Sequence, residues 1–241
     1  MQRIAFAALC VGLIWNCPVR VVSAKDDLSV TVTPVPRDAG WLNRHEQINA
    51  RAKEGDVDLL FIGDSITQGW GNNAAWKKFY GDRKAMNAGI SGDRTEHVLW
   101  RLDNGNVDGI SPKLAVIMIG TNNSGSNTGE DIAAGIKAIV AKLRKKLPQT
   151  KILLLGIFPR GEQPDDAKRQ VTMAANEIAR TLDDGKSVFY LDIGEKLMAP
   201  DGTISKDIMP DYLHLTDKGY EIWAESIEPK VAELLGDTPK S

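Results

Sequence analysis

A serine, a histidine and an aspartate in this sequence have the side-chain types of an acyl-transfer site. Ser65 follows Gly63 and Asp64 at the end of an apolar run, and His214 lies three residues after Asp211. A serine hydroxyl is a weak nucleophile until a base takes its proton, and an imidazole held by a carboxylate suits that task. Alone, the serine could instead be a turn or helix-cap residue, and an Asp-x-x-His spacing is common by chance. These residues therefore need support from the rest of the chain.

Two further loops supply candidate donors for the negative charge that develops during acyl transfer. The oxyanion needs fixed N–H groups where that charge appears. The backbone N–H groups of Ser65 and Gly92 could serve, with the side-chain amide of Asn122 as a third donor. A glycine allows the backbone to approach a ligand closely. Each loop residue has an ordinary explanation by itself, but the whole set together predicts a serine esterase site.

The remaining histidines are less suited to act as the base. His45 lies in a polar segment before the first expected strand, and we expect it at the surface. His97 falls within a helix that we expect to start at Asp93, where Asp93 and Glu96 would form a capping box. A packed or surface role is expected for His97. The candidate base is therefore His214, since histidine normally titrates near neutral pH.

The elements that must position these residues alternate between strand and helix. Short, continuously apolar runs bounded by turn residues are typical of strands buried on both faces. Such runs occupy residues 59–62, 84–88, 114–119, 152–158 and 188–191. Helices are expected at residues 41–53, 74–80, 93–102, 128–147, 165–183 and 216–234, whereas a tight turn and a polar stretch are expected after the first strand. This alternation predicts an α/β fold with a doubly wound, five-stranded parallel sheet.

The expected sheet would gather the candidate residues at one edge. In open α/β sheets, ligands bind outside the carboxyl ends of the strands. Ser65, Gly92 and Asn122 each follow an expected strand, so all three should lie at that edge. The loop that carries Asp211 and His214 follows the fifth strand and can fold back to it.

Residues 1–24 are predicted to be a secretory leader. Arg3 precedes an apolar segment that is too short to span a bilayer, and residues 22–24 have the small-residue form of a cleavage site. Both cysteines, Cys10 and Cys17, lie in this leader, so the processed chain would have no disulfide and no thiol nucleophile. A leader that is retained as a membrane anchor is the alternative.

The rest of the chain is expected to form an N-terminal linker and helix over residues 25–56 and a hydrolase domain over residues 57–236. A hydrophobic content of 42% and a net charge of −2 are typical of a globular domain and do not indicate a nucleic-acid-binding protein. No cluster of metal ligands is visible, so we expect neither a metal nor a cofactor. The expected partner is a small-molecule ester, with no stable membrane insertion after leader removal. The oligomeric state is left open.

Four blocks of the chain resemble, in order, the blocks of the SGNH, or GDSL, hydrolases. They are Gly63-Asp64-Ser65, Gly92, Gly120-Thr121-Asn122 and Asp211-x-x-His214. The chain is similar in more detail to the catalytic subunits of intracellular platelet-activating-factor acetylhydrolase. The motifs that carry this similarity are Gly89-Ile90-Ser91-Gly92-Asp93, His97-Val98-Leu99-Trp100-Arg101-Leu102, Gly120-Thr121-Asn122-Asn123, Pro159-Arg160-Gly161, Asp201-Gly202-Thr203-Ile204-Ser205 and Asp211-Tyr212-Leu213-His214-Leu215.

This resemblance implies a flavodoxin-like, three-layer α/β/α fold and a role for each site residue. Ser65 would be the nucleophile, His214 the base and Asp211 the partner that orients it. The oxyanion hole would consist of Ser65, Gly92 and Asn122. The resemblance also implies a structural role for His97.

The leader sets this chain apart from those subunits, so their phospholipid substrate and regulatory partner are not carried over. Secreted relatives of this general type often remove acetyl groups from polysaccharides or small esters. We therefore expect a secreted or periplasmic, bacterial serine esterase for short acyl groups, acetyl above all. The Asn122-Asn123-Ser124 sequon favours a bacterial route, because a glycan on Asn122 would block the site. The alternatives are a lysophospholipase or lipase-like hydrolase and a catalytically silent ligand-binding module on the same fold.

Overall fold

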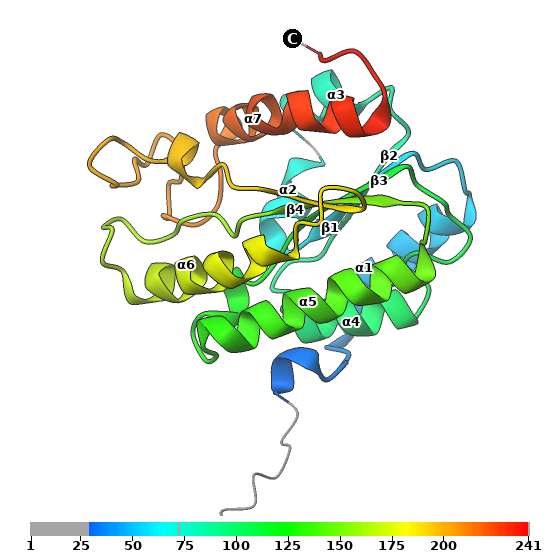
Figure 1. The fold of residues 1–241 in the computed structure, drawn as a ribbon, viewed down its shortest axis with the longest axis horizontal. Coiled ribbons are helices and arrows are strands. Elements are labelled where there is room, and N and C mark those ends of the chain that lie inside the picture. The colour runs from blue at the N-terminus through cyan, green and yellow to red at the C-terminus, as the bar shows by residue number, and fades with distance from the viewer. Residues whose placement is uncertain (1–28, 72, 241) are drawn as a thin grey trace, which may run out of the picture.

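A parallel five-stranded sheet forms the centre of the protein, between two layers of helices (Figure 1). The computed structural model describes residues 29–71 and 73–240. The strands are β1 (Leu59–Gly63), β2 (Ala85–Gly89), β3 (Leu114–Met118), β4 (Lys151–Leu155) and β5 (Val188–Leu191), in the order β2-β1-β3-β4-β5. Every neighbouring pair is parallel. This is the flavodoxin-like order, so the predicted fold class is confirmed.

The strands are continuously apolar because both faces of the sheet are covered. In β1, Leu60 and Ile62 belong to one hydrophobic core and Leu59 and Phe61 to the other, and all four side chains are buried. Successive side chains of a strand point to opposite faces, so a strand with a core on each side needs apolar residues at every position.

Within residues 29–71 and 73–240, four helices belong to one core and three to the other. Figure 1 shows the two helical layers on opposite faces of the sheet. The first set is α1 (Ala39–Lys53), α4 (Thr95–Asp103), α5 (Gly129–Lys146) and α6 (Ala167–Ala179), and the second is α2 (Ser65–Trp70), α3 (Ala74–Tyr80) and α7 (Asp217–Leu235). Thr128 caps α5, since its hydroxyl accepts a bond from the N–H of Asp131. Thr216 caps α7 in the same way by accepting the N–H of Gly219, so both helices begin one residue after the predicted start.

Helix α2 was not predicted, because the sequence indicated a tight turn and then a polar stretch. The Asp64 carboxylate accepts a bond from the N–H of Ile66 and caps this helix, which makes Ser65 its first residue. A helix of six residues is too short to produce a clear apolar period.

The start of α4 also differs from the prediction. Its N-cap is Arg94 rather than Asp93, and the backbone N–H of Arg94 donates to Nδ1 of His97 instead of to Glu96. The Asp93 side chain instead accepts hydrogen bonds from other side chains, which are described below. The N3 acceptor is therefore a histidine, a residue type outside the usual Glu/Gln capping pattern.

His45 is buried, and the prediction of a surface position was wrong. Its ring stacks on Trp41 and lies within hydrogen-bonding distance of the side chains of Asn49 and Asn106, at 3.0 Å each. The polar residues around it in the sequence hid this position, because its partners are amides that satisfy the ring inside the protein.

The described part of the segment before α1 packs against the domain. A short 3-10 helix, η1 (Val30–Val32), includes the buried Thr31, whose carbonyl accepts a bond from the Thr95 hydroxyl and whose own hydroxyl donates to the carbonyl of Asp131. The predicted leader lies outside the described residues. Among the helices that are described, none is long and apolar enough to cross a membrane.

Candidate active site

Ser65 lies where the chain leaves β1 and enters α2. Its hydroxyl is 2.9 Å from Nε2 of His214, which is 149 residues away in the sequence. Asp64, directly before it, is fully buried, whereas Ser65 is half-buried and accessible. The turn after β1 therefore presents a hydroxyl to an imidazole at hydrogen-bonding distance, which is the geometry that a general base requires.

Asp211 holds the other side of the same imidazole. Its Oδ2 is 2.6 Å from Nδ1 of His214, and its Oδ1 accepts bonds from the backbone N–H groups of Leu213 and His214. Partial burial raises the pKa of Asp211, but the bonds from the His214 ring and backbone outweigh it and lower the pKa overall. The carboxylate therefore stays charged and favours the imidazole tautomer that carries its proton on Nδ1.

The loop that follows β2 contains Gly92 in the left-handed region, with a φ of 76°. A Cβ atom at this position would lie 2.8 Å from the guanidinium of Arg37, a flexible side-chain end that could shift, so it is the backbone angle that favours glycine here. Arg37 in turn donates to the carbonyl of Ser91 at 2.7 Å. The segment before α1 thus helps to shape this loop.

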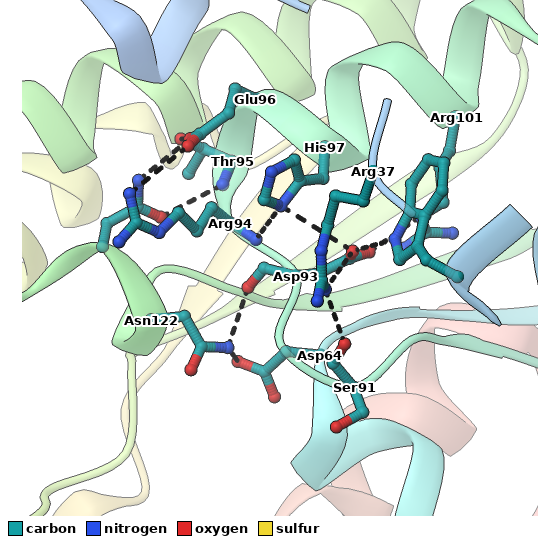
Figure 2. Close-up of polar contacts among 12 residues, drawn as sticks. Arg37, Asp64, Ser91, Asp93, Arg94, Thr95, Glu96, His97, Arg101 and Asn122 are labelled. Atoms are coloured by element: carbon teal, nitrogen blue, oxygen red, sulfur yellow. Dashed lines mark hydrogen bonds and ion pairs between the residues drawn. The ribbon is translucent and has the colours of Figure 1, made fainter. Parts of the chain in front are cut away.

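Asn122 lies in the short 3-10 helix η2 (Thr121–Asn123), directly after β3. Its side-chain amide donates to the carbonyl of Asp93 at 2.9 Å and lies 3.5 Å from Oδ2 of Asp64. Figure 2 shows this amide pointing toward both residues. Because Asp64 precedes Ser65 and Asp93 follows Gly92, these contacts bring the three candidate donor loops together.

The neighbouring Asn123 makes different contacts and is fully buried. Its amide nitrogen donates to Glu96 at 3.0 Å, and its oxygen accepts the N–H of Thr95 at the start of α4. Asn123 therefore ties η2 to α4, whereas Asn122 faces the residues that flank Ser65 and Gly92.

Asp93 is a buried carboxylate that sequence reasoning assigned wrongly, as a helix cap. It accepts a bond from Nε1 of Trp41 at 2.6 Å. It also accepts a bond from Nε of Arg101 at 2.8 Å (Figure 2). Burial raises the pKa of Asp93, while the charge of Arg101 and the bonds from both partners act against that rise. Since Trp41 comes from α1, no local pattern around Asp93 could have revealed this arrangement.

Two other ionisable groups near the site have pKa values shifted by burial. Burial, together with the nearby charge of Asp93 and against a bond from the N–H of Ile66, raises the pKa of Asp64 to about 7. Burial lowers the pKa of His97 to about 4, so its ring is neutral at neutral pH and can accept the N–H of Arg94.

A loop after β4 connects the two sides of the site. Arg160 donates to the carbonyl of Thr121 at 3.1 Å, and the N–H of Gly161 donates to the carbonyl of Tyr212 at 2.9 Å. The buried side chain of Arg169, on α6, donates to the carbonyls of Arg160 and Gly161. For this loop only a family resemblance could be stated from the sequence, and Arg169 was not identified.

No group of three or more His, Cys, Asp and Glu residues within the described parts of the chain is arranged to hold a metal ion. The residues that meet around Ser65 can take up a proton, hold an imidazole and donate hydrogen bonds. These are the capacities that acyl transfer requires.

The family of the chain follows from comparison with known proteins. Residues 61–222 match the model of the GDSL-like lipase/acylhydrolase family. The chain is 39% identical over 204 residues to the rat platelet-activating factor acetylhydrolase IB subunit alpha2, covering 84% of this chain and 88% of that protein.

Two solved structures share the fold at lower identity. A GDSL-like lipase from Bacteroides thetaiotaomicron has a TM-score of 0.60 at 19% identity and covers 79% of this chain and 97% of its own. An acetylxylan esterase from Geobacillus stearothermophilus has a TM-score of 0.57 at 17% identity, and the match covers 75% of this chain and 94% of the esterase chain. With the family match and the close relative, these findings show that the chain belongs to the GDSL-like lipase/acylhydrolase family and is an ester hydrolase.

Proposed function

We propose that this chain is a secreted serine esterase that removes short acyl groups, acetyl above all, through an acyl-enzyme. The observation that carries the proposal is the 2.9 Å contact between Oγ of Ser65 and Nε2 of His214, whose Nδ1 is 2.6 Å from Asp211. Alternating roles of the imidazole as base and acid are sufficient to form and to hydrolyse such an intermediate.

In the first half of the proposed reaction, Nε2 of His214 takes the proton of Ser65 as its oxygen attacks the ester carbonyl carbon. The carbonyl oxygen becomes an oxyanion that accepts bonds from the N–H groups of Ser65 and Gly92 and from the amide of Asn122. Collapse of the intermediate breaks the ester bond, and the imidazolium gives its proton to the departing alcohol.

In the second half, water attacks the acyl carbon of the intermediate and gives a proton to Nε2 of His214. The tetrahedral species collapses, Ser65 recovers its proton and the carboxylic acid leaves. Asp211 keeps its charge throughout and stabilises the imidazolium that forms in each half. The proposal includes no metal and no cofactor, so EDTA is expected to leave turnover unchanged.

The preference for acetyl esters is supported by the names of the similar proteins, which include an acetylhydrolase subunit and an acetylxylan esterase. Acetylated carbohydrates are therefore proposed as substrates beside small esters. Export from the cytoplasm is supported by the leader-like composition of residues 1–24. N-terminal sequencing of exported protein is expected to start near Lys25, whereas an intact Met1 on membrane-bound protein would favour the anchored form.

The nucleophile is tested with a fluorophosphonate probe and a series of p-nitrophenyl esters of increasing acyl length. Wild-type protein is expected to label stoichiometrically and to prefer the acetyl ester, and Ser65→Ala is expected to lose both labelling and turnover. Ser91→Ala is the matched control, since Ser91 is a nearby exposed hydroxyl. Turnover by folded Ser65→Ala would contradict the mechanism. A preference for long chains would indicate a lipase-like enzyme, and an unlabelled wild type would indicate a silent binding module.

A further inference from the structure

We propose that Asp93 is a positioning residue that fixes two of the oxyanion-hole donors at once, an inference that rests on the proposed serine-esterase function. Its backbone carbonyl accepts the amide of Asn122 at 2.9 Å, and its peptide nitrogen is joined to Gly92. Any movement of Asp93 would therefore shift both the N–H of Gly92 and the amide of Asn122. What holds Asp93 in place then sets the geometry of the oxyanion hole.

The side chain of Asp93 is held by the helices α1 and α4, which are far apart from each other in the sequence. Trp41 of α1 donates to Oδ1 at 2.6 Å, and Arg101 of α4 donates to Oδ2 at 2.8 Å. The carboxylate has no solvent exposure. Figure 2 shows Asp93 between the side chains of Arg101, Arg37 and His97, with its carbonyl turned toward Asn122.

Arg101 is itself fixed by a second layer of contacts. It donates to Oδ1 of Asn106 at 2.6 Å, and it lies 3.4 Å from the carbonyl of Gly63, the last residue of β1. The amide of Asn106 donates to Asn49 of α1 at 2.6 Å. The network therefore connects α1, α4 and the end of the strand that presents Ser65.

The charge on Asp93 indicates a geometric role rather than a contribution to stability alone. Burying an ion pair costs desolvation energy, and well-packed apolar residues in its place are often equally stable or more so. A carboxylate offers instead several acceptor sites with fixed directions, and here it receives donors from two separate helices. Such directional bonds determine where the Asp93 backbone lies.

The variant Asp93→Asn is expected to displace the loop that carries Gly92, while a side chain of similar size still fills the position. An amide can accept only through its oxygen, so its NH₂ group would face either Trp41 or Arg101, both of which are donors. A misplacement of about 1 Å can cost about 10²-fold in rate. We expect kcat per fluorophosphonate-titrated active site to fall about 10- to 100-fold, with KM little changed.

A matched control comes from a second buried ion pair. Glu228 accepts two bonds from Arg83, both at 2.7 Å, and this pair contacts the C-terminal segment rather than the site residues. Glu228→Gln is expected to lower the melting temperature and to leave kcat per active site unchanged. A purely structural role for Asp93 predicts the same pattern for Asp93→Asn.

The double variant Asp93→Asn/Asn122→Ala tests whether the two residues act together. If Asp93 acts through Asn122, kcat of the double variant should fall by less than the product of the two single effects. Trp41→Phe removes one donor to Asp93 and is the second probe should Asp93→Asn not fold; we expect a smaller loss of kcat with KM unchanged.

The inference is overturned if the folded Asp93→Asn variant, or Trp41→Phe in its place, keeps the wild-type kcat, or if the effects in the double variant simply multiply. The proposed function fails separately. Turnover by Ser65→Ala would contradict the serine mechanism, whereas an inactive Ser65→Ala beside a fully active Asp93→Asn would reject only the role of Asp93.

Discussion

The two sides of the candidate site are held in different ways. On one side, the backbone carbonyl of Asp93 accepts the amide of Asn122, and the carboxylate of the same residue, next to Gly92, is fully buried. On the other, the side chains of Asp211 and His214 are 54% and 44% exposed. Oxyanion donors act only where charge develops and must be placed closely, whereas a base has to reach the serine and exchange protons with substrate and water.

The exposed side is fixed through backbone groups of its own loop and of a neighbouring loop, and no buried carboxylate takes part in these contacts. Oδ1 of Asp211 accepts two backbone N–H groups of its own loop, and the N–H of Gly161 donates to Tyr212 in the middle of that loop. Gly161 is held by the buried Arg169. The loop of the proposed base therefore contacts a neighbouring loop, whereas the loops of the proposed oxyanion donors are contacted by side chains from the helices α1 and α4.

The largest effect is expected from Asp211→Asn, in addition to the loss of the nucleophile itself. An asparagine at this position can keep the two backbone bonds only by turning its NH₂ group toward Nδ1 of His214, which favours the wrong tautomer. We expect kcat to fall by about 10⁴-fold with KM little changed. Steady-state kinetics on folded protein checks this, and an unaltered rate would mean that another group orients His214.

Asn122→Ala is expected to produce the next largest effect. Loss of one oxyanion donor typically lowers kcat by about 10²–10³-fold, and KM should change little because the ground-state carbonyl carries no such charge. Asn123→Ala is the matched control, since its amide joins η2 to α4. It is expected to lower the melting temperature more than the rate, and the reverse outcome would exchange the roles assigned to the two asparagines.

Arg169→Lys probes the support of the exposed side. The guanidinium donates to the carbonyls of Arg160, Gly161 and Gly202, and a lysine can replace only part of this fork. We expect a lower melting temperature and a loss of about tenfold in kcat, because the loops that carry Thr121 and Tyr212 would loosen. Arg180→Lys at an exposed helix end is the control, and equal kinetics for the two variants would show that Arg169 does not support the site.

Much of the fold could be predicted because its strands are covered on both faces. The expected bounds of α3 and β5 agree with the structure, and those of β1 and β3 differ by one residue. The errors arose where local pattern and tertiary contact disagree. Helix α2 is too short to show an apolar period, and one of the two polar partners of the buried His45 ring is Asn106, 61 residues away.

The same distinction applies to the site. Ser65, Asn122 and His214 were identified from residue type and position after strands, and the structure brings Ser65 and His214 into contact, while their catalytic roles stay predictions. The residues that hold them could not be identified in this way. Asp93 accepts a bond from Trp41, which is 52 residues away. Arg169 donates to backbone carbonyl groups, and because every residue has one, the sequence does not reveal these partners.

The smallest expected effect concerns the pH dependence of stability, because the two sides of the site lose their contributions to the free energy of unfolding at different pH values. Burial lowers the pKa of His97 from an ordinary 6.5 to about 4, so the unfolded chain binds its proton more readily than the folded protein. The resulting stability is fully present above about pH 6.5 and is lost as the pH falls toward 4. Asp211, whose pKa is lowered from 3.8, loses its contribution only at more acidic pH.

In His97→Gln, the amide oxygen can still accept the N–H of Arg94 but the side chain does not titrate. Between pH 7 and pH 4.5 its loss in free energy of unfolding should therefore be smaller than that of the wild type, by on the order of 2 kcal/mol. Asp64, whose pKa is about 7, and His45 are present in both proteins, so their own titration cancels in the comparison. Urea unfolding at the two pH values measures this difference. An equal loss in free energy of unfolding in both proteins would show that protonation of His97 does not cause the acid sensitivity of the buried side.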